Sequence, residues 1–123
     1  MIPVRLPKKT KKRGRYNSVP PEKRTMDGVV FDSKAEMLRY AALQNRQRLG
    51  EITDLRQADS YPLSVNGIII GKYTPDFEYR ENNVLVIEEF KSKETAKAAD
   101  YRLRRKVFEA STGLTVYEHI GGK

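Results

Sequence analysis

Two carboxylates and one lysine in the second half of the chain have types and a spacing that could support chemistry. Asp76 is followed by Glu89, and Lys91 comes two residues after Glu89. Carboxylate oxygens are the ligands that Mg²⁺ and Mn²⁺ prefer. A lysine beside them can hold an attacking water or stabilise the charge that develops on a phosphate. The three side chains are therefore compatible with a metal-dependent reaction at a phosphate.

The dipeptide Asn82-Asn83 separates two predicted strands and decides whether these groups meet. Asparagine tolerates left-handed φ, so we expect a two-residue turn. Counting back along the antiparallel pair then places Asp76 opposite Glu89. The same register places Thr74 opposite Lys91. Because side chains alternate between the two faces of a strand, both carboxylates and the lysine are expected on one face.

The neighbouring residue Glu88 leaves an alternative open. A bulge or a three-residue turn would bring Glu88, rather than Glu89, opposite Asp76. The lysine two residues after Glu89 favours Glu89. Carboxylate and lysine pairs across strands are also ordinary surface features. However, the apolar run at 84–87 indicates a central strand covered on both faces, where charges are costly.

Two longer stretches resemble a known motif. Tyr73-Thr74-Pro75-Asp76-Phe77, followed by Ile87-Glu88-Glu89-Phe90-Lys91, is similar to the PD-(D/E)XK nuclease motif. From about Arg15 to Ile120 the chain resembles a family of small phage-encoded proteins assigned to that superfamily. The matching features are the helix opening Phe31–Glu36, the Pro75-Asp76 strand, Glu89-x-Lys91, and a basic helix with Tyr101, Lys106 and Phe108. The resemblance implies an α/β (α+β), restriction-endonuclease-like core of order α-β-β-β-α-β, with a central mixed sheet flanked by helices.

The same resemblance implies an activity and assigns residues to it. It implies Mg²⁺-dependent phosphodiester cleavage, with Mn²⁺ as a substitute, and in small basic members often the resolution of Holliday junctions. Asp76 and Glu89 would be metal ligands and Lys91 the catalytic lysine. Glu36 corresponds to an acid of the first helix that many members add to the metal site. Ser33 and Glu36 also form a capping box, which explains Glu36 without any metal.

The net charge of +8 is concentrated at the N-terminus. Residues 1–25 hold nine basic side chains and one acidic one, whereas residues 26–123 are balanced. We therefore expect a flexible basic arm over 1–25, which would contact DNA phosphates, and a nuclease-like domain over 26–123. The DNA contacts expected from the arm are Lys8, Lys9, Lys11, Lys12, Arg13 and Arg15.

A second helix is predicted from Lys93 to Ser111, directly after the candidate site. Its basic face would grip DNA phosphates, with Arg102 and Lys106 toward the site. An ordinary solvated helix face is the alternative. The DNA contacts expected from this helix are Tyr101, Arg102, Arg105 and Lys106.

Other elements follow from periodicity and turn signals. Ser33 is expected to start a first helix that Gly50 ends, with an apolar stripe that includes Leu38 and Leu49. In the second helix the stripe includes Leu103 and Val107. We expect a connecting link at 51–57 and a hairpin at 61–70 around Asn66-Gly67. Further strands are expected at about 73–81, 84–91 and 114–120.

Composition excludes several classes of protein. The chain has no cysteine, so thiolate metal sites and disulfide scaffolds are excluded. We found no apolar run of the roughly 20 residues that a membrane span needs and no signal peptide. The expected setting is therefore the cytoplasm, of a bacterial host if the chain is phage-encoded.

The leading hypothesis is a Holliday junction resolvase acting on branched DNA as a homodimer, since symmetric cutting of a junction requires two sites. One alternative is a non-catalytic DNA-binding module that keeps the nuclease fold. The other is a nuclease that prefers flaps or nicks.

Overall fold

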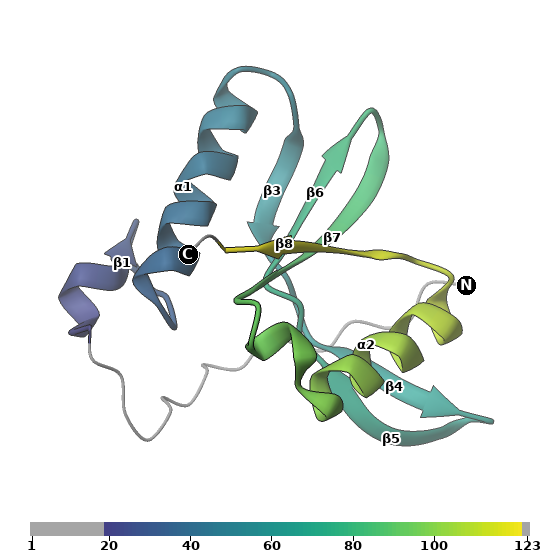
Figure 1. Ribbon diagram of the computed structural model, residues 1–123. Coiled ribbons are helices and arrows are strands. Elements are labelled where there is room, and N and C mark those ends of the chain that lie inside the picture. Colours follow the sequence, from purple (N-terminus) through teal and green to yellow (C-terminus); the bar gives the residue numbers. More distant parts are fainter. Residues whose placement is uncertain (1–18, 122–123) are drawn as a thin grey trace.

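The computed structural model describes residues 19–121 and has a four-stranded mixed sheet at its centre (Figure 1). Its strands lie in the order β3 (Thr53–Gln57), β6 (Phe77–Glu81), β7 (Val84–Lys91) and β8 (Val116–Ile120). The pairs β3–β6 and β6–β7 are antiparallel, and β7–β8 is parallel. The expected class, α+β with a central mixed sheet and two helices, is confirmed.

The helices α1 (Lys34–Arg48) and α2 (Ala99–Thr112) lie on opposite faces of this sheet. Ile87 of β7 packs in a cluster with Tyr101 and Phe108 of α2. The preceding residue, Val86, packs against a second cluster that contains Leu43 of α1. Since consecutive strand residues point to opposite faces, the two helices cover the two sides of β7, which is central as its apolar run predicted.

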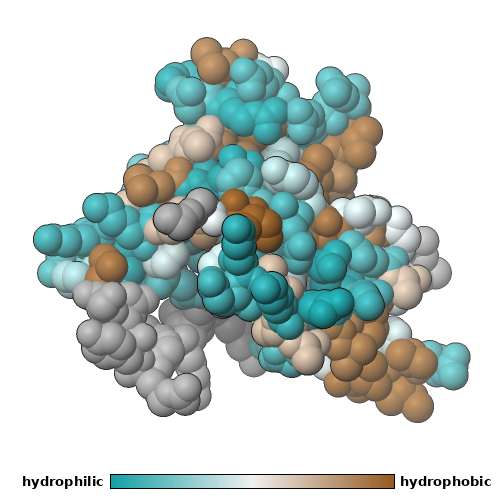
Figure 2. Space-filling model, in the orientation of Figure 1, coloured by the Kyte–Doolittle hydropathy of each residue, from teal (hydrophilic) through white to brown (hydrophobic). Residues whose placement is uncertain are grey.

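The strands β4 (Tyr61–Val65) and β5 (Ile68–Tyr73) form a separate two-stranded sheet that packs against α2 (Figure 1). Asn66 and Gly67 form its turn with φ of 52° and 81°, as the sequence predicts. Figure 2 shows apolar side chains gathered over this hairpin. The exposed ones are Val65, Ile68, Ile69 and Ile70, with Leu103 of α2 exposed as well.

Two predicted boundaries were wrong in this region. The strand expected at 73–81 is divided, because Tyr73 ends β5 and β6 begins only at Phe77. Pro75 lies between them and has no N–H to donate to a ladder. The link expected at 51–57 contains the edge strand β3. This strand was not predicted because its sequence is polar and lacks a clear alternation. Its pairing with β6 is also irregular between Thr53 and Arg56.

The expected apolar stripe of the first helix was also wrong. Leu38 and Leu49 are exposed, whereas Leu43 is buried. The helix is rotated so that the ring of Tyr40 packs 5.4 Å, between centroids, from both Phe31 and Phe77. An aromatic ring buries more apolar area than an alanine or leucine, and this contact decides which face of α1 is covered.

The second helix differs from its prediction in a similar way. Leu103 is exposed, whereas Val107 packs against the core as expected, beside the buried Tyr101 and Phe108. The segment expected to be helical from residue 93 contains a 3₁₀ turn, η2 (Thr95–Lys97), before α2 begins. The last strand begins at Val116, two residues later than expected.

The N-terminal part of the described chain folds onto the body. A 3₁₀ turn, η1 (Pro21–Arg24), precedes the short strands β1 (Thr25–Met26) and β2 (Val29–Val30). Arg24 is buried and donates to the carbonyls of Val19 and Phe31 at 2.9 and 2.5 Å. Residues 19–25 therefore belong to the folded body and not to the expected arm. The arm residues Lys8, Lys9, Lys11, Lys12, Arg13 and Arg15 lie outside the described residues.

Neither helix of the described region has the length and apolar character needed to cross a membrane.

Candidate functional site

The Asn82-Asn83 turn sets the register that the site depends on. Both residues have left-handed φ, 54° and 64°, and the ladder runs from Glu81 opposite Val84 to Phe77 opposite Glu88. The predicted two-residue turn is confirmed. Just beyond the last ladder pair the backbone N–H of Asp76 still donates to the carbonyl of Glu88, 3.2 Å away, and Asp76 and Glu89 approach each other there.

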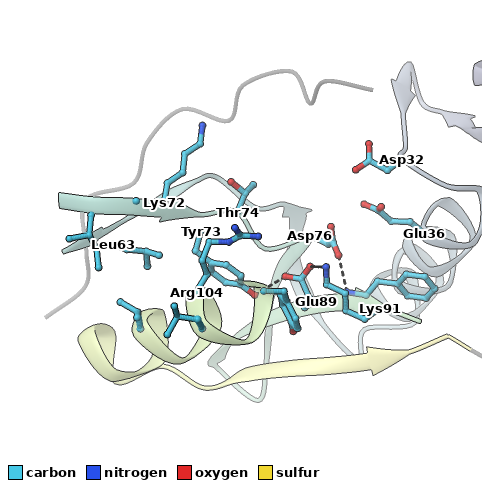
Figure 3. Close-up of a pocket in the computed structure, with 16 residues that line it drawn as sticks. Asp32, Glu36, Leu63, Lys72, Tyr73, Thr74, Asp76, Glu89, Lys91 and Arg104 are labelled. Carbon is cyan, nitrogen blue, oxygen red and sulfur yellow. Dashed lines mark hydrogen bonds and ion pairs between the residues drawn. The ribbon is translucent and has the colours of Figure 1, made fainter. Parts of the chain in front are cut away.

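The expected pairing of Thr74 with Lys91 was wrong. The ladder between the two strands ends at Phe77, and the Thr74 hydroxyl lies 2.6 Å from that of Ser60. The carbonyl of Lys91 accepts instead from the backbone N–H of Gly121, 2.8 Å away. Lys91 still shares a cavity with the carboxylates, because its side chain extends from the same face of β7 as that of Glu89 (Figure 3).

Both carboxylates are buried and held by protein donors. Asp76 accepts a 2.8 Å hydrogen bond at Oδ2 from the backbone N–H of Phe90. Glu89 accepts one of 2.7 Å at Oε1 from the hydroxyl of Tyr73. Burial and the nearby charge of Asp76 raise the pKa of Glu89 to about 8. The negative charge of the pair is therefore only partly compensated.

Lys91 supplies part of the compensating positive charge. Its Nζ lies 3.4 Å from Oε2 of Glu89 and 4.3 Å from the ring centroid of Tyr101. The hydroxyl of Tyr101 donates to Oε2 of Glu118 at 2.6 Å, and the residue is buried. The sequence predicts Tyr101 as a DNA contact, and this stays a prediction; in the structure its ring faces Lys91 and its hydroxyl is engaged by Glu118. It positions the lysine through a cation–π contact.

The N-terminus of α1 brings two more acids to the cavity (Figure 3). Glu36 is buried and lines the cavity, and Asp32 lies beside it. Ser33 accepts from the backbone N–H of Glu36 at 3.0 Å, so the expected N-cap is confirmed. The cap uses the backbone N–H of Glu36, and the residue also lines the cavity. Sequence reasoning did not select Asp32 as a site residue, although it lies in the helix opening Phe31–Glu36.

Glu88 points away from this cavity. Arg39 of α1 donates to both of its carboxylate oxygens at 2.7 and 3.0 Å, and the hydroxyl of Tyr79 donates at 2.7 Å. The alternation of side chains along β7 thus puts Glu89 beside Asp76 and Glu88 on the opposite face. The alternative that the sequence left open is decided in favour of Glu89.

The cavity has a volume of about 710 Å³. Of the basic residues of α2, Arg104 lines it, and sequence reasoning had missed this residue. Arg102, Arg105 and Lys106, the predicted DNA contacts, do not line it. Arg105 instead lies 3.5 Å from both Glu109 and Glu118. Arg102 and Lys106 are on the outer surface of the helix.

The donor chemistry of the site fits a hard divalent cation. Asp76 and Glu89 offer buried carboxylate oxygens, and Glu36 and Asp32 lie along the same wall. Mg²⁺ often takes only one or two protein carboxylates and fills its other positions with water and substrate phosphate oxygens. Within residues 19–121, no three Asp, Glu, His or Cys side chains converge on a single point as ligands of one ion. Asp76 and Glu89 are the residues that would hold the cation.

Comparison with known proteins gives a family without a described activity. The family described as "Protein of unknown function (DUF1064)" matches residues 13–121. No curated protein matches the chain, and no solved structure matches it.

Proposed function

The chain belongs to the DUF1064 family, and we propose that it is a metal-dependent DNA endonuclease that resolves Holliday junctions. The observation that carries the proposal is the approach of two buried carboxylates, Asp76 and Glu89, beside Lys91 on the wall of one cavity. We further propose that the strands β6 and β7 and the helix α1 correspond to the PD-(D/E)XK core, which the sequence resembles.

The proposed reaction is hydrolysis of a DNA phosphodiester. Water attacks phosphorus, the bond to one sugar oxygen breaks, and that oxygen leaves with a proton. A bound Mg²⁺ would polarise the phosphate and activate the water. Asp76 and Glu89 would hold the cation, with Glu36 beside them. Lys91 would orient the attacking water or stabilise the charge that develops on the phosphate oxygens.

The role of Lys91 depends on its surroundings. Its ammonium group lies beside the carboxylate of Glu89 and over the face of the Tyr101 ring, and both contacts hold it in place. Its side chain is partly exposed toward the cavity, with a relative accessibility of 23%. The lysine is therefore held in position yet accessible to a substrate phosphate.

The charge of the whole chain supports DNA as the partner. A net charge of +8 attracts polyanions, and phosphate contacts release counterions. Symmetric cutting of a four-way junction requires two active sites, so the proposal includes a two-fold homodimer. The proposed place of action is the cytoplasm of a bacterial host, in which phage DNA recombines.

The proposal is tested by cleavage of defined DNA substrates. The full-length protein is incubated with a four-way junction, a flap, a nicked duplex and a linear duplex, each with Mg²⁺, Mn²⁺ or EDTA. We expect paired cuts in the junction with either metal and none in EDTA. If the flap or the nicked duplex is cut faster than the junction, the protein is a nuclease specific for flaps or nicks and not for junctions. If all four substrates stay intact with both metals, the chain is not a nuclease.

A further inference from the structure

The cavity extends well beyond the carboxylates. In Figure 3, Glu36, Asp76 and Glu89 lie toward one end, and Leu63 and Lys72 lie toward the other. The lining of the second end is largely apolar and comes from β4, β5 and α2. Its apolar residues are Leu63, Ile70, Gly71, Leu103 and Val107. The cavity volume of about 710 Å³ is within the range of about 300–1,000 Å³ typical of small-molecule sites, so the second end can take a ligand group of its own.

An irregularity of the hairpin shapes this second end. Leu63 pairs with Gly71, but the next residue of β4, Ser64, pairs with Ile69. Ile70 is therefore an extra, unpaired residue of β5, which is a β-bulge. Bulges redirect side chains and are frequent beside functional sites. Here the bulge leaves both Ile70 and Gly71 on the cavity wall.

Gly71 keeps the wall open. A Cβ built at this residue would meet no atom within 4 Å, and its φ is not in the left-handed region. Neither crowding nor backbone conformation therefore requires glycine here. A glycine inside a strand often marks a place where a ligand approaches closely. Any larger residue at this position would take up space in the cavity.

The chemistry of this wall combines apolar surface with positive charge. Leu103 and Ile70 are 64% and 59% exposed, which is high for large apolar side chains that line a cavity. Lys72 and Arg104 line the same space. Arg104 forms an ion pair at 3.4 Å with the exposed Asp100. An apolar wall flanked by cations matches a nucleotide, which has an apolar base face and an anionic phosphate.

We propose that this second end of the cavity, named here the base pocket and lined by Ile70, Gly71, Leu103 and Arg104, holds one unpaired nucleobase next to the phosphate that is cut. The inference rests on the proposed nuclease function and specifies its substrate. A base inside an intact duplex is stacked and cannot enter, whereas bases at a branch point unstack more easily. The base pocket thus selects DNA with an unpaired nucleotide, without contacts to a particular sequence.

The experiment uses 2-aminopurine, a fluorescent base whose emission rises when it leaves the stack. Full-length protein is added in EDTA, so that the DNA stays uncut, to four-way junctions that carry the probe at successive positions around the branch point. We expect a several-fold rise in emission at one position on each cut strand. Probes within the duplex arms should not change. Fluorescence anisotropy of an end label measures affinity in the same samples.

Three variants separate the base pocket from the rest of the protein. Gly71→Val fills the pocket and Leu103→Ser removes its apolar wall, so both should abolish the rise even at protein concentrations that saturate junction binding. Ser64→Val, which introduces the same side chain at an exposed position of the hairpin outside the cavity, should behave as the wild type. Circular dichroism verifies that all three variants are folded.

The outcomes distinguish this inference from the proposed function. A rise that persists in Gly71→Val, or that is absent at every position in the wild type, overturns the base pocket even if the protein cuts junctions with Mg²⁺. Failure to cut any DNA overturns the nuclease proposal, whereas the fluorescence experiment in EDTA remains readable. A third outcome would also overturn the base pocket. If the wild type shows no rise in fluorescence but forms a dimer, and if Gly71→Val or Leu103→Ser abolishes that dimer, the wall contacts a second copy of the chain.

Discussion

The backbone N–H of Phe90 donates a 2.8 Å hydrogen bond to the carboxylate of Asp76. Phe90 lies between Glu89 and Lys91, so this bond fixes Asp76 relative to both. Asp76 precedes β6 and lies beyond the last ladder pair, and its own backbone N–H donates to the carbonyl of Glu88 at 3.2 Å. The backbone bond and the side-chain bond together hold Asp76 against β7 and set the geometry of the candidate site.

Replacing Asp76 with Asn should abolish cleavage but preserve the fold and junction binding. The Asn carbonyl oxygen can still accept from the N–H of Phe90, while the charge that would bind the metal is lost. Loss of a residue that only orients a metal ligand typically lowers metal affinity or activity about 10–100-fold. Because Asp76 would be a ligand itself, we expect the cleavage rate to fall by at least about 100-fold. Gel assays measure cleavage and anisotropy measures affinity. The exposed Asp54→Asn is the control. Cleavage by Asp76→Asn at the wild-type rate would exclude Asp76 as a ligand.

Replacing Glu89 with Gln should stabilise the metal-free protein at high pH. The pKa of Glu89 is raised from 4.5 to about 8. In the pH window between these two values, the folded protein therefore binds more protons than the unfolded chain does. The free energy of unfolding of the wild type therefore falls as pH rises through the window. The glutamine of the variant does not titrate, so its stability lacks this fall.

The measurement is Tm in EDTA at pH 5 and pH 8.5. The Tm of Glu89→Gln relative to the wild type should be higher at pH 8.5 than at pH 5, and the exposed Glu94→Gln should show no such change. Mg²⁺ should raise the Tm of the wild type at pH 8.5 and have little effect on Glu89→Gln. An equal difference at both pH values would mean that Glu89 ionises normally in the folded protein.

Replacing Arg39 with Leu should destabilise the fold strongly. The change leaves Glu88, which is fully buried, without its bidentate partner. Removal of one partner of a buried pair typically costs about 3–5 kcal/mol. Urea unfolding at pH 7 measures the change. The double replacement of Arg39 and Glu88 by Leu should recover part of the loss.

Arg46→Leu is the control for this prediction. Arg46 pairs with Glu51 and Glu81 in a more exposed setting, where an ion pair typically contributes about 0–1 kcal/mol. If Arg39→Leu costs no more than this control, the ion pair with Glu88 is not a main support of the fold.

Substituting glutamine for Lys8, Lys9, Lys11, Lys12, Arg13 and Arg15 should weaken the salt dependence of junction binding. If all six contact phosphates, the slope of log affinity against log salt should decrease in magnitude by up to about 5. The slope is measured by anisotropy over a range of NaCl concentrations. Cleavage at low salt should persist, because the candidate site is unchanged. An unchanged slope would show that these six side chains do not contact the DNA.

The arrangement of Asp76 and Glu89 could be predicted from the sequence because local rules determine it. The left-handed φ of Asn82 and Asn83 fixes a two-residue turn, and strand alternation then decides which side chains share a face. The helix start at Ser33 is equally local, since a single hydrogen bond to the N–H of Glu36 defines it. Such features involve residues that are close in sequence or are connected by one turn.

The features that sequence reasoning missed depend on contacts between distant residues. Which face of α1 is buried depends on the ring of Tyr40 between Phe31 and Phe77, and no helical period reveals those partners. Arg104 lines the cavity because α2 packs on the β4–β5 hairpin. Residue type alone did not distinguish it from Arg102 or Arg105.

Consecutive glutamates on β7 make the protein sensitive to the length of one loop. Glu88 binds Arg39 on one side of the sheet, and Glu89 lies in the cavity on the other. An inserted residue that is absorbed between Val84 and Glu88 would move Glu88 into the cavity position of Glu89 and Phe90 into that of Lys91. The variant would keep one carboxylate at that cavity position, but it would lose the lysine there and the glutamate that faces Arg39. Length changes at this hairpin should therefore be rare among natural variants that retain activity, even where its sequence varies.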